Sequence, residues 1–245
     1  MNLYDFPPIA ALIQGASWLV TQLSDLLIPL AGVNSAALAV VLLTILVRAV
    51  LIPVGRSQVR ATITRQRLAP RIAELQTRHK KDPERLGKEL TKLYAAEKTS
   101  PFAGLLPVLA QTPVLMAVYG LFILPTVAGQ PNLLLGHTLL GVGLDAKFFA
   151  TLTSGVISWP TVAVFACVMA AIALVAYLSR RFLAVAPLPT SGLPRALSYL
   201  PFATVLVAGV VPLAAALYLV TTTTWTFVER LILHHLYGVG SPSGD

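Results

Sequence analysis

Long apolar segments with very few charges dominate this chain and restrict the folds open to it. About five of them are long enough to cross the roughly 30 Å hydrocarbon core of a bilayer. Only 11% of the 245 residues are charged, whereas soluble domains carry about 25%. Because a backbone in lipid must satisfy its own hydrogen bonds, we expect the segments to be helices. The sequence therefore predicts an all-α integral membrane protein with a five-helix transmembrane core.

The basic residues are concentrated in one block, which predicts the orientation. Of 18 Lys and Arg residues, 12 lie between Arg56 and Lys98. If the first span runs inward, the loops and tail on the cytoplasmic side hold nearly all of the rest, and Lys147 alone lies outside. The positive-inside rule then places the N-terminus outside and the C-terminus in the cytoplasm. We expect a multi-pass membrane protein with this orientation and without a cleavable signal peptide.

The order of apolar and charged segments predicts the domain organisation. Residues 1–35 contain no Lys or Arg, and Leu26 and Leu30 belong to an apolar stripe at helical spacing, with Trp18 as a possible anchor. This favours an amphipathic helix lying in the outer interface, although a sixth span is the competing interpretation. The other predicted segments are a first span (36–55), a cytoplasmic basic helical hairpin (56–99), a second span (100–124), an external loop (125–157), a third span (158–178), a cytoplasmic loop (179–195), a fourth span (196–211), a fifth span (212–235) and a short cytoplasmic tail (236–245).

The basic block has the pattern of two amphipathic helices joined by a short turn. Apolar residues recur at a spacing near 3.6 on both sides of residues 79–85. Asp82 is a suitable N-cap and Pro83 a suitable first residue for the second arm. The hairpin is either a solvated coiled-coil loop or a docking surface for a partner or for anionic headgroups. In the second case the docking residues are Arg60, Arg65, Arg67, Arg71, Arg78, Lys80, Lys81, Arg85 and Lys88.

Arg48 lies well inside the first apolar span and is the residue that most constrains function. A charged side chain near the bilayer centre costs about 2.5 kcal/mol or more, so it normally faces a bundle interior or a water-filled cavity. Three interpretations remain open. Arg48 extends to the cytoplasmic interface, pairs with a buried acid, or lines a hydrated groove. Pairing is the weakest of these, because no Asp or Glu lies within a predicted span short of its end.

Other polar residues are placed to share such a groove. Thr44 lies one turn before Arg48, and Gln111 lies deep in the second span. In the fifth span Tyr218 and Thr222 fall on one helical face, which continues through Trp225 and Glu229. Each residue alone is explained by ordinary hydrogen bonding between helices. Together with Arg48 they predict an amphiphilic cavity.

Signatures of catalysis and of metal or cofactor binding are missing from the sequence. It contains no HExxH, GxSxG or P-loop motif. Cys167, the single cysteine, lies in an apolar run, where a small hydrophobic role is expected. We therefore expect no enzyme activity and no cofactor.

Four stretches resemble the YidC/Oxa/Alb family of membrane protein insertases, in the short form without a large external domain. They are LLTILVRAVLIPVGRSQ (42–58), LAPRIAELQTRHKKDPERLGKELTKLY (68–94), SPFAGLLPVLAQTPVLMAVYGLF (100–122) and YLPFATVLVAGVVPLAAALYLVTTTTWTFVER (199–230). The resemblance covers residues 36–235, with the third span matched only by position and hydropathy.

The resemblance implies insertion and folding of membrane proteins, alone or beside the Sec translocon, through a hydrophilic groove. The family's groove arginine falls on Arg48 and its polar positions on Gln111 and near Thr222. Implied partners are new membrane proteins, the Sec translocon, the ribosome, signal recognition machinery and anionic lipids, with no specific nucleic acid. Two other classes stay open, a small-solute transporter and a membrane scaffold whose hairpin recruits partners. The short tail after Leu236 contains no basic residue, unlike the long basic tails of some family members.

Overall fold

The structure is a computed structural model in which helices predominate. It describes residues 4, 6–100, 102, 105–155, 158–183 and 200–236. The predicted cytoplasmic loop around Arg195, residues 184–199, and the tail after Leu236 lie outside the described residues.

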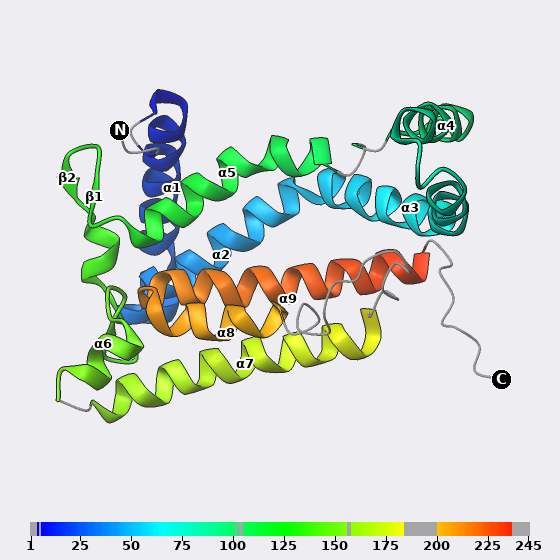
Figure 1. Cartoon of the computed structure of the whole chain (residues 1–245). Helices are drawn as coiled ribbons and strands as arrows, with labels where there is room; N and C mark the ends of the chain where they lie inside the picture. The colour runs from blue at the N-terminus through cyan, green and yellow to red at the C-terminus, as the bar shows by residue number, and fades with distance from the viewer. Residues whose placement is uncertain are drawn as a thin grey trace.

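The first helix lies across the ends of the others. Helix α1 (Pro7–Ala31) is followed by the short 3-10 helix η2 (Gly32–Asn34) and by α2 (Ser35–Val50). In Figure 1, α1 stands crosswise to α2, α5, α7 and α9 while packing against α2 and α5. Gly32 has a φ of 53°, which a residue without Cβ adopts readily, and so permits the sharp change of direction.

Part of the leucine stripe of α1 faces away from the protein, although Leu19 and Leu23 of the same stripe pack against the core. Leu26 and Leu30 are 72% and 85% exposed, and α1 instead packs inward through a face that includes Ile13 and Val20. Exposed leucines on a helix that belongs to an apolar bundle are suited to contact with lipid. The interfacial position of α1 stays a prediction, as does the competing interpretation of a sixth span.

The first span and the first hairpin arm form an almost continuous helix in the structure. Helix α3 (Ile52–Arg78) begins directly after Leu51, which separates it from α2, and Pro53 lies in its first turn. Pro is tolerated there because the first N–H groups of a helix have no partner within the helix. The arm therefore starts several residues before the predicted boundary at 55/56.

The second hairpin arm, α4 (Pro83–Ala96), begins as the sequence predicts. The Asp82 side chain accepts a hydrogen bond from the backbone N–H of Arg85 (3.0 Å). At the base of the hairpin, Arg67 and Arg71 both pair with Glu97. These contacts join α3 to the end of α4 and hold the hairpin closed.

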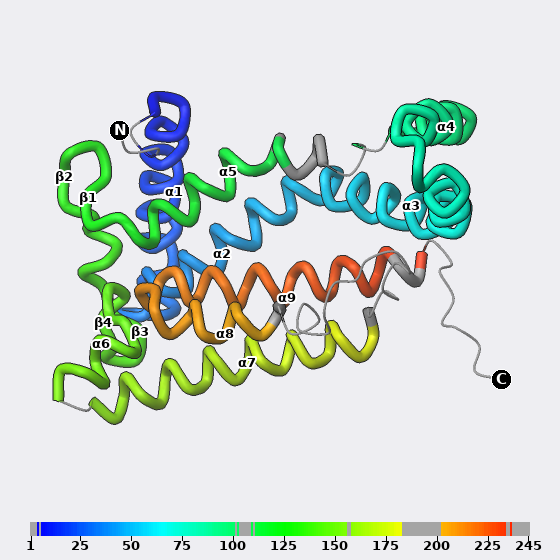
Figure 2. The backbone as a smooth tube through the Cα atoms, viewed as in Figure 1, coloured from blue at the N-terminus to red at the C-terminus, as the bar shows by residue number. Residues whose placement is uncertain are grey.

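Four further helices and a compact loop region complete the fold. The helices are α5 (Leu105–Ile123), α7 (Trp159–Leu183), α8 (Leu200–Val210) and α9 (Leu213–Leu236). The segment predicted as an external loop contains secondary structure of its own. Its elements are β1 (Thr126–Val127) paired with β2 (Gln130–Pro131), η3 (Leu133–Gly136), β3 (Thr138–Leu139) paired with β4 (Val142–Gly143), and α6 (Phe148–Thr153). Figure 2 shows this loop region at the end of the molecule opposite the α3–α4 hairpin.

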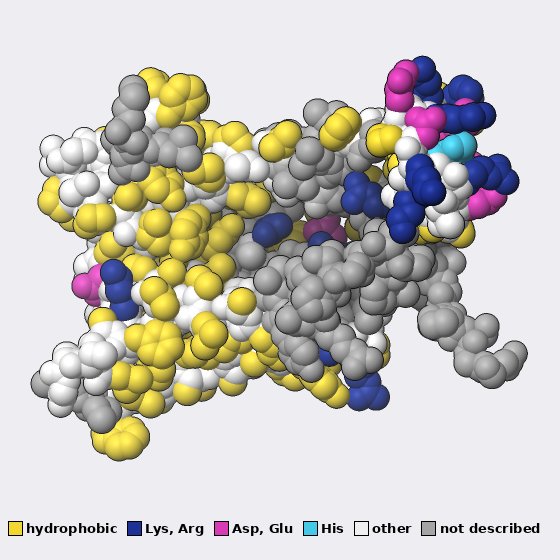
Figure 3. Space-filling model, in the orientation of Figure 1, with side chains coloured by type: hydrophobic (Ala, Val, Ile, Leu, Met, Phe, Trp, Pro, Cys, Tyr) yellow, Lys and Arg dark blue, Asp and Glu magenta, His cyan; other side chains and the backbone are white. Residues whose placement is uncertain are grey.

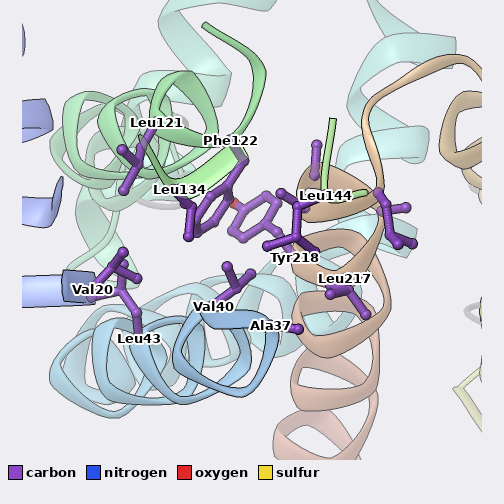
Figure 4. Close-up of a cluster of buried hydrophobic side chains, with 14 of the residues drawn as sticks. Val20, Ala37, Val40, Leu43, Leu121, Phe122, Leu134, Leu144, Leu217 and Tyr218 are labelled. Carbon is purple, nitrogen blue, oxygen red and sulfur yellow. The ribbon is translucent and has the colours of Figure 1, made fainter. Parts of the chain in front are cut away.

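The core lies near the loop region, where five parts of the chain meet. Figure 4 shows side chains from α1, α2, α5, the loop region and α9 converging on the rings of Phe122 and Tyr218. These two ring centroids are 5.9 Å apart, and Phe122 is completely buried. Alanines on α2 and α9 are also fully buried, so these two backbones approach closely, as is usual where small residues face each other in membrane helices.

Two helical segments of the described residues are both long and apolar enough to cross a membrane. They are Pro7–Val50, which contains α1 and α2, and Trp159–Phe182 within α7. The apolar part of α5, Gln111–Ile123, is shorter. The fold is thus that of a mostly helical membrane protein.

Asn132 connects the loop region to the end of α5 and provides a first prediction. Its Nδ2 donates to the carbonyl oxygens of Leu121 (2.7 Å) and Leu124 (2.9 Å), and the side chain is buried. Asn132→Ala should lower the free energy of unfolding by about 1–3 kcal/mol, because it leaves buried carbonyls without a donor. Thermal unfolding in detergent measures this. Asn34→Ala, which removes an exposed acceptor for Leu140 N–H, is the control and should cost less; equal losses would contradict the account.

Candidate substrate groove

Arg48 is held inside the helical bundle by a hydrogen bond between α2 and α9. Its Nε donates to Thr222 Oγ1 at 2.7 Å, and the guanidinium is partly buried. Arg48 lies in the last turn of α2, where the unpaired carbonyls at a helix C-terminus favour a positive charge. The break at Leu51 therefore places the end of α2, and with it the arginine, inside the bundle.

A partly open groove surrounds this arginine. It contains about 890 Å³ of empty space, part of it continuous with the surroundings, between α2, α3, α5 and α9. Figure 3 shows basic and acidic side chains within a hollow of an otherwise largely apolar face. The lining residues are mostly polar. They are Arg48, Leu51, Gly55, Gln58, Val59, Thr62, Gln111, Thr226, Glu229 and Arg230.

The structure brings together some of the predicted groove residues and separates others. Arg48 and Gln111 line the groove, and Thr222 contacts Arg48. Thr44 and Tyr218 do not line it, since they are 0% and 7% exposed within the core. The Thr44 hydroxyl donates to the Val40 carbonyl of its own helix (2.7 Å). Both residues lie one turn, about 5.4 Å, from the Arg48–Thr222 pair, so the groove ends there in packed core.

Three polar atoms near the groove are buried without a hydrogen-bond partner in the described structure. They are Gln58 Nε2, Trp225 Nε1 and Glu229 Oε1. The Trp225 indole lies beside the Glu229 carboxylate but does not form a hydrogen bond of good geometry with it. Buried polar groups are normally paired, and those that are not mark sites of bound water or of function. Water or a polar ligand in the groove would satisfy them.

The hairpin carries a separate basic surface. All nine predicted docking residues are exposed, and several of them form ion pairs within the hairpin, including Arg78 with Glu74 (3.6 Å) and Lys88 with Glu84 (2.7 Å). Such exposed pairs contribute only about 0.2–1 kcal/mol each. They therefore leave the cations available to a partner.

A further ion pair on α4 changes the pKa of its acidic member. Lys92 donates a hydrogen bond to Glu89 (2.8 Å), which lowers the pKa of that carboxyl from its ordinary value. The Glu89 carboxylate is thus stabilised in its ionised form by the neighbouring base.

Comparison with known proteins assigns the family. A family model described as "60Kd inner membrane protein", which represents the YidC/Oxa/Alb family, matches residues 29–238. The chain belongs to this family. The match includes every residue that lines the groove and the whole α3–α4 hairpin.

Individual YidC/Oxa/Alb relatives match over shorter segments. The chain is similar to a "Membrane protein insertase YidC" of Clostridium perfringens, 40% identical over 85 residues, which is 35% of this chain and 36% of that protein. Proteins of the same name from Dechloromonas aromatica (41% over 81 residues, 33% of this chain, 15% of that protein) and Streptomyces avermitilis (36% over 106 residues, 42% and 25%) also match. The aligned segments span about a third or less of the lengths of these three relatives.

For a member of the YidC/Oxa/Alb family, the groove combines two chemical properties. Amides, hydroxyls and a guanidinium can hydrogen-bond a polar peptide segment, while apolar helix faces lie directly beside them. Sequence reasoning missed Gln58 and Thr226, which belong to the two helices that extend the groove toward the hairpin. Helical spacing could have indicated Thr226, which follows Thr222 by one turn, but not Gln58, which lies on the next helix beyond the break at Leu51.

Proposed function

We propose that this protein inserts membrane proteins into the lipid bilayer by accepting a polar segment of the client in the groove around Arg48. The observation that carries the proposal is the hydrogen bond from Arg48 to Thr222 inside a polar groove of an apolar bundle. A guanidinium there attracts an acidic or strongly polar client tail. Family membership, and relatives named as insertases, support this function.

The proposed arrangement has five spans, formed by α2 with the start of α3, then α5, α7, α8 and α9. The N-terminus and the loop region with Lys147 lie outside, and the hairpin and the C-terminus lie in the cytoplasm. The position of the basic hairpin at one end of the molecule and of the loop region at the other supports this orientation. The protein then lies in the bacterial plasma membrane, and its groove opens toward the cytoplasmic half of the bilayer.

The proposed mechanism needs no nucleotide. The groove shortens the distance over which a polar tail must cross hydrocarbon, because polar side chains replace part of its hydration. The apolar segment of the client then moves from the groove into lipid, and burial contributes about 25 cal/mol per Å² of apolar surface. An outward-moving acidic tail gains about 2.3 kcal/mol per charge for each 100 mV of membrane potential. These terms together drive insertion.

Reconstitution tests this function directly. The purified protein is placed in vesicles, a single-span client with an acidic N-terminal tail is added, and protection of the tail from external protease is measured. Protection should rise well above that of vesicles without the protein, and an imposed membrane potential, inside the vesicle positive relative to the side of addition, should raise it further. Equal protection in both vesicle preparations would show that the protein is not an insertase.

The exposed bases of the hairpin form part of the proposal as a docking surface. The partner classes are a ribosome carrying a client, signal recognition machinery, the Sec translocon and anionic headgroups, and a basic surface suits the phosphates of the ribosome and of the headgroups best. Raising the salt concentration from about 10 mM to about 100 mM should weaken such contacts, because the screening length between exposed charges falls to about 10 Å at 0.1 M.

Charge reversal at the turn of the hairpin tests the docking surface. Combined replacement of Lys80, Lys81 and Arg85 with Glu should reduce crosslinking of the hairpin to ribosomes that carry a client by about tenfold at low salt. Protein stability should not change, because these side chains are exposed. Lys147→Glu, an exposed cation in the loop region, is the control. Unchanged crosslinking in the triple variant would remove the docking role and leave the groove proposal intact.

A further inference from the structure

Glu229 places a carboxylate inside the groove that the proposed mechanism does not use. It lies on α9 seven residues after Thr222, or about 10 Å further along the helix. Its Oε1 atom is buried and accepts no hydrogen bond in the described structure. The side chain as a whole is half-buried, and a buried oxygen without a donor is costly, so the position of this atom calls for an explanation.

The backbone of α3 makes room for this carboxylate. A Cβ atom added at Gly55 would overlap the side chain of Glu229, whereas the glycine itself leaves space for it. Gly55 lies in the first turn of α3, just after the break that separates α2 from α3. The close approach fixes the carboxylate against the wall of the groove, on the side that leads to the hairpin.

Three arginines surround this single acid. Glu229 lies in the electric field of Arg48, Arg230 and Arg56, with Arg48 the strongest of the three. The hydrogen bond from Arg48 Nε nevertheless goes to Thr222. Glu229 therefore reduces the positive potential of the groove, while Arg48 Nε stays hydrogen-bonded to Thr222.

A client carboxylate that enters the groove meets both charges. Arg48 attracts it and Glu229 repels it, so the net attraction is smaller than Arg48 alone would give. The repulsion from Glu229 grows with the number of acidic residues in the tail, and a tail without charge does not experience it. The acid in the groove thus has the position needed to discriminate between clients by charge.

We infer that Glu229 tunes the charge response of the groove, acting as an internal counter-anion to Arg48 that weakens the attraction of the groove for acidic client tails. It is a positioning residue in this role, since it acts through the field at Arg48. The inference rests on the proposed insertase function and adds to it the client property that the groove recognises, which is the charge of the tail. A purely structural role would instead change the insertion of all clients equally.

A series of clients with zero, one and three acidic residues in the same tail tests the inference. Glu229→Gln removes the charge and keeps the size of the side chain. It should raise insertion of the one-acid client about threefold, the order expected for one charge acting across a hydrated groove, raise that of the three-acid client at least as much, and change the zero-acid client little. Glu84→Gln, which removes an exposed carboxylate of α4 paired with Lys88, is the matched control and should leave the series unchanged.

Two further variants separate the possible failures. In an Arg48→Ala background, Glu229→Gln should give no charge-dependent gain, because the cation on which it acts is gone. An unchanged series in Glu229→Gln, or an equal change for all three clients, would overturn the inference while Arg48→Ala still tests the proposed function. Glu229→Ala makes the same change of charge with a smaller side chain, and it decides the question if Glu229→Gln does not fold.

Discussion

Arg48→Ala is expected to reduce insertion of single-span clients with acidic tails by about tenfold to a hundredfold, since a hydrogen bond to a charged group contributes about 1.5–3 kcal/mol. The variant removes the guanidinium that lines the groove and bonds to Thr222. Clients whose translocated segments carry no charge should be affected less. Protease protection of the client tail, measured across both client types in the same vesicles, gives the result.

Two milder replacements show whether charge or geometry matters at this position. Arg48→Lys keeps the charge but loses the planar donor group, so it should retain much of the activity. Thr222→Val keeps Arg48 and removes the acceptor that orients it, so activity should fall to an intermediate level. If Arg48→Ala protein folds normally and inserts every acidic client at the full rate, the mechanism proposed for the groove is wrong.

Periodicity predicted which helix faces meet but not how deep the groove extends. Arg48, Gln111 and Thr222 were expected to converge, and the structure brings them to one place. Thr44 shares a helix face with Arg48, and Tyr218 shares one with Thr222. Both nevertheless lie one turn further into the buried core. A sequence pattern repeats with every turn, so it cannot show at which turn Phe122 and its neighbours close the space.

Glu229 was on the predicted polar face but was interpreted as the end of the fifth span. The structure continues α9 to Leu236 and turns Glu229 into the groove that contains Arg48. The sequence makes pairing with an acid of the same chain the weakest interpretation of Arg48, because Glu229 lies only at the end of a predicted span. The sequence gives no sign of the cavity that Gly55 leaves for it.

Local rules succeeded where short-range chemistry decides the structure. Asp82 and Pro83 begin α4 as expected, because capping depends on a few adjacent residues. The loop region was expected to lack regular structure, and its four strands of two residues each are too short to show a period of two. The inward face of α1 was also missed, since in a membrane protein both faces of a helix can be apolar.

Phe122→Ala should cause the largest loss of stability among the changes considered, about 3–5 kcal/mol. Phe122 is 0% exposed and lies between α1, α2, the loop region and α9, with its ring 5.9 Å from that of Tyr218. Neighbours fixed on so many elements cannot move together to fill the space, and lipid cannot reach it. The loss therefore consists mainly of dispersion contacts, which matter even where the surrounding solvent is apolar.

Comparison with an exposed residue separates packing from hydrophobicity in this prediction. Leu26→Ala removes an apolar side chain that is 72% exposed on α1, and it should change the unfolding temperature in detergent little. Phe122→Leu, which retains part of the volume, should fall between the two variants. Because Phe122 belongs to the core beyond the end of the groove, Phe122→Ala protein that remains folded should keep the client-charge dependence of the unmodified protein. A similar small loss for Phe122→Ala and Leu26→Ala would mean that the end of the groove is not tightly packed, and the explanation for the burial of Thr44 and Tyr218 would fail with it.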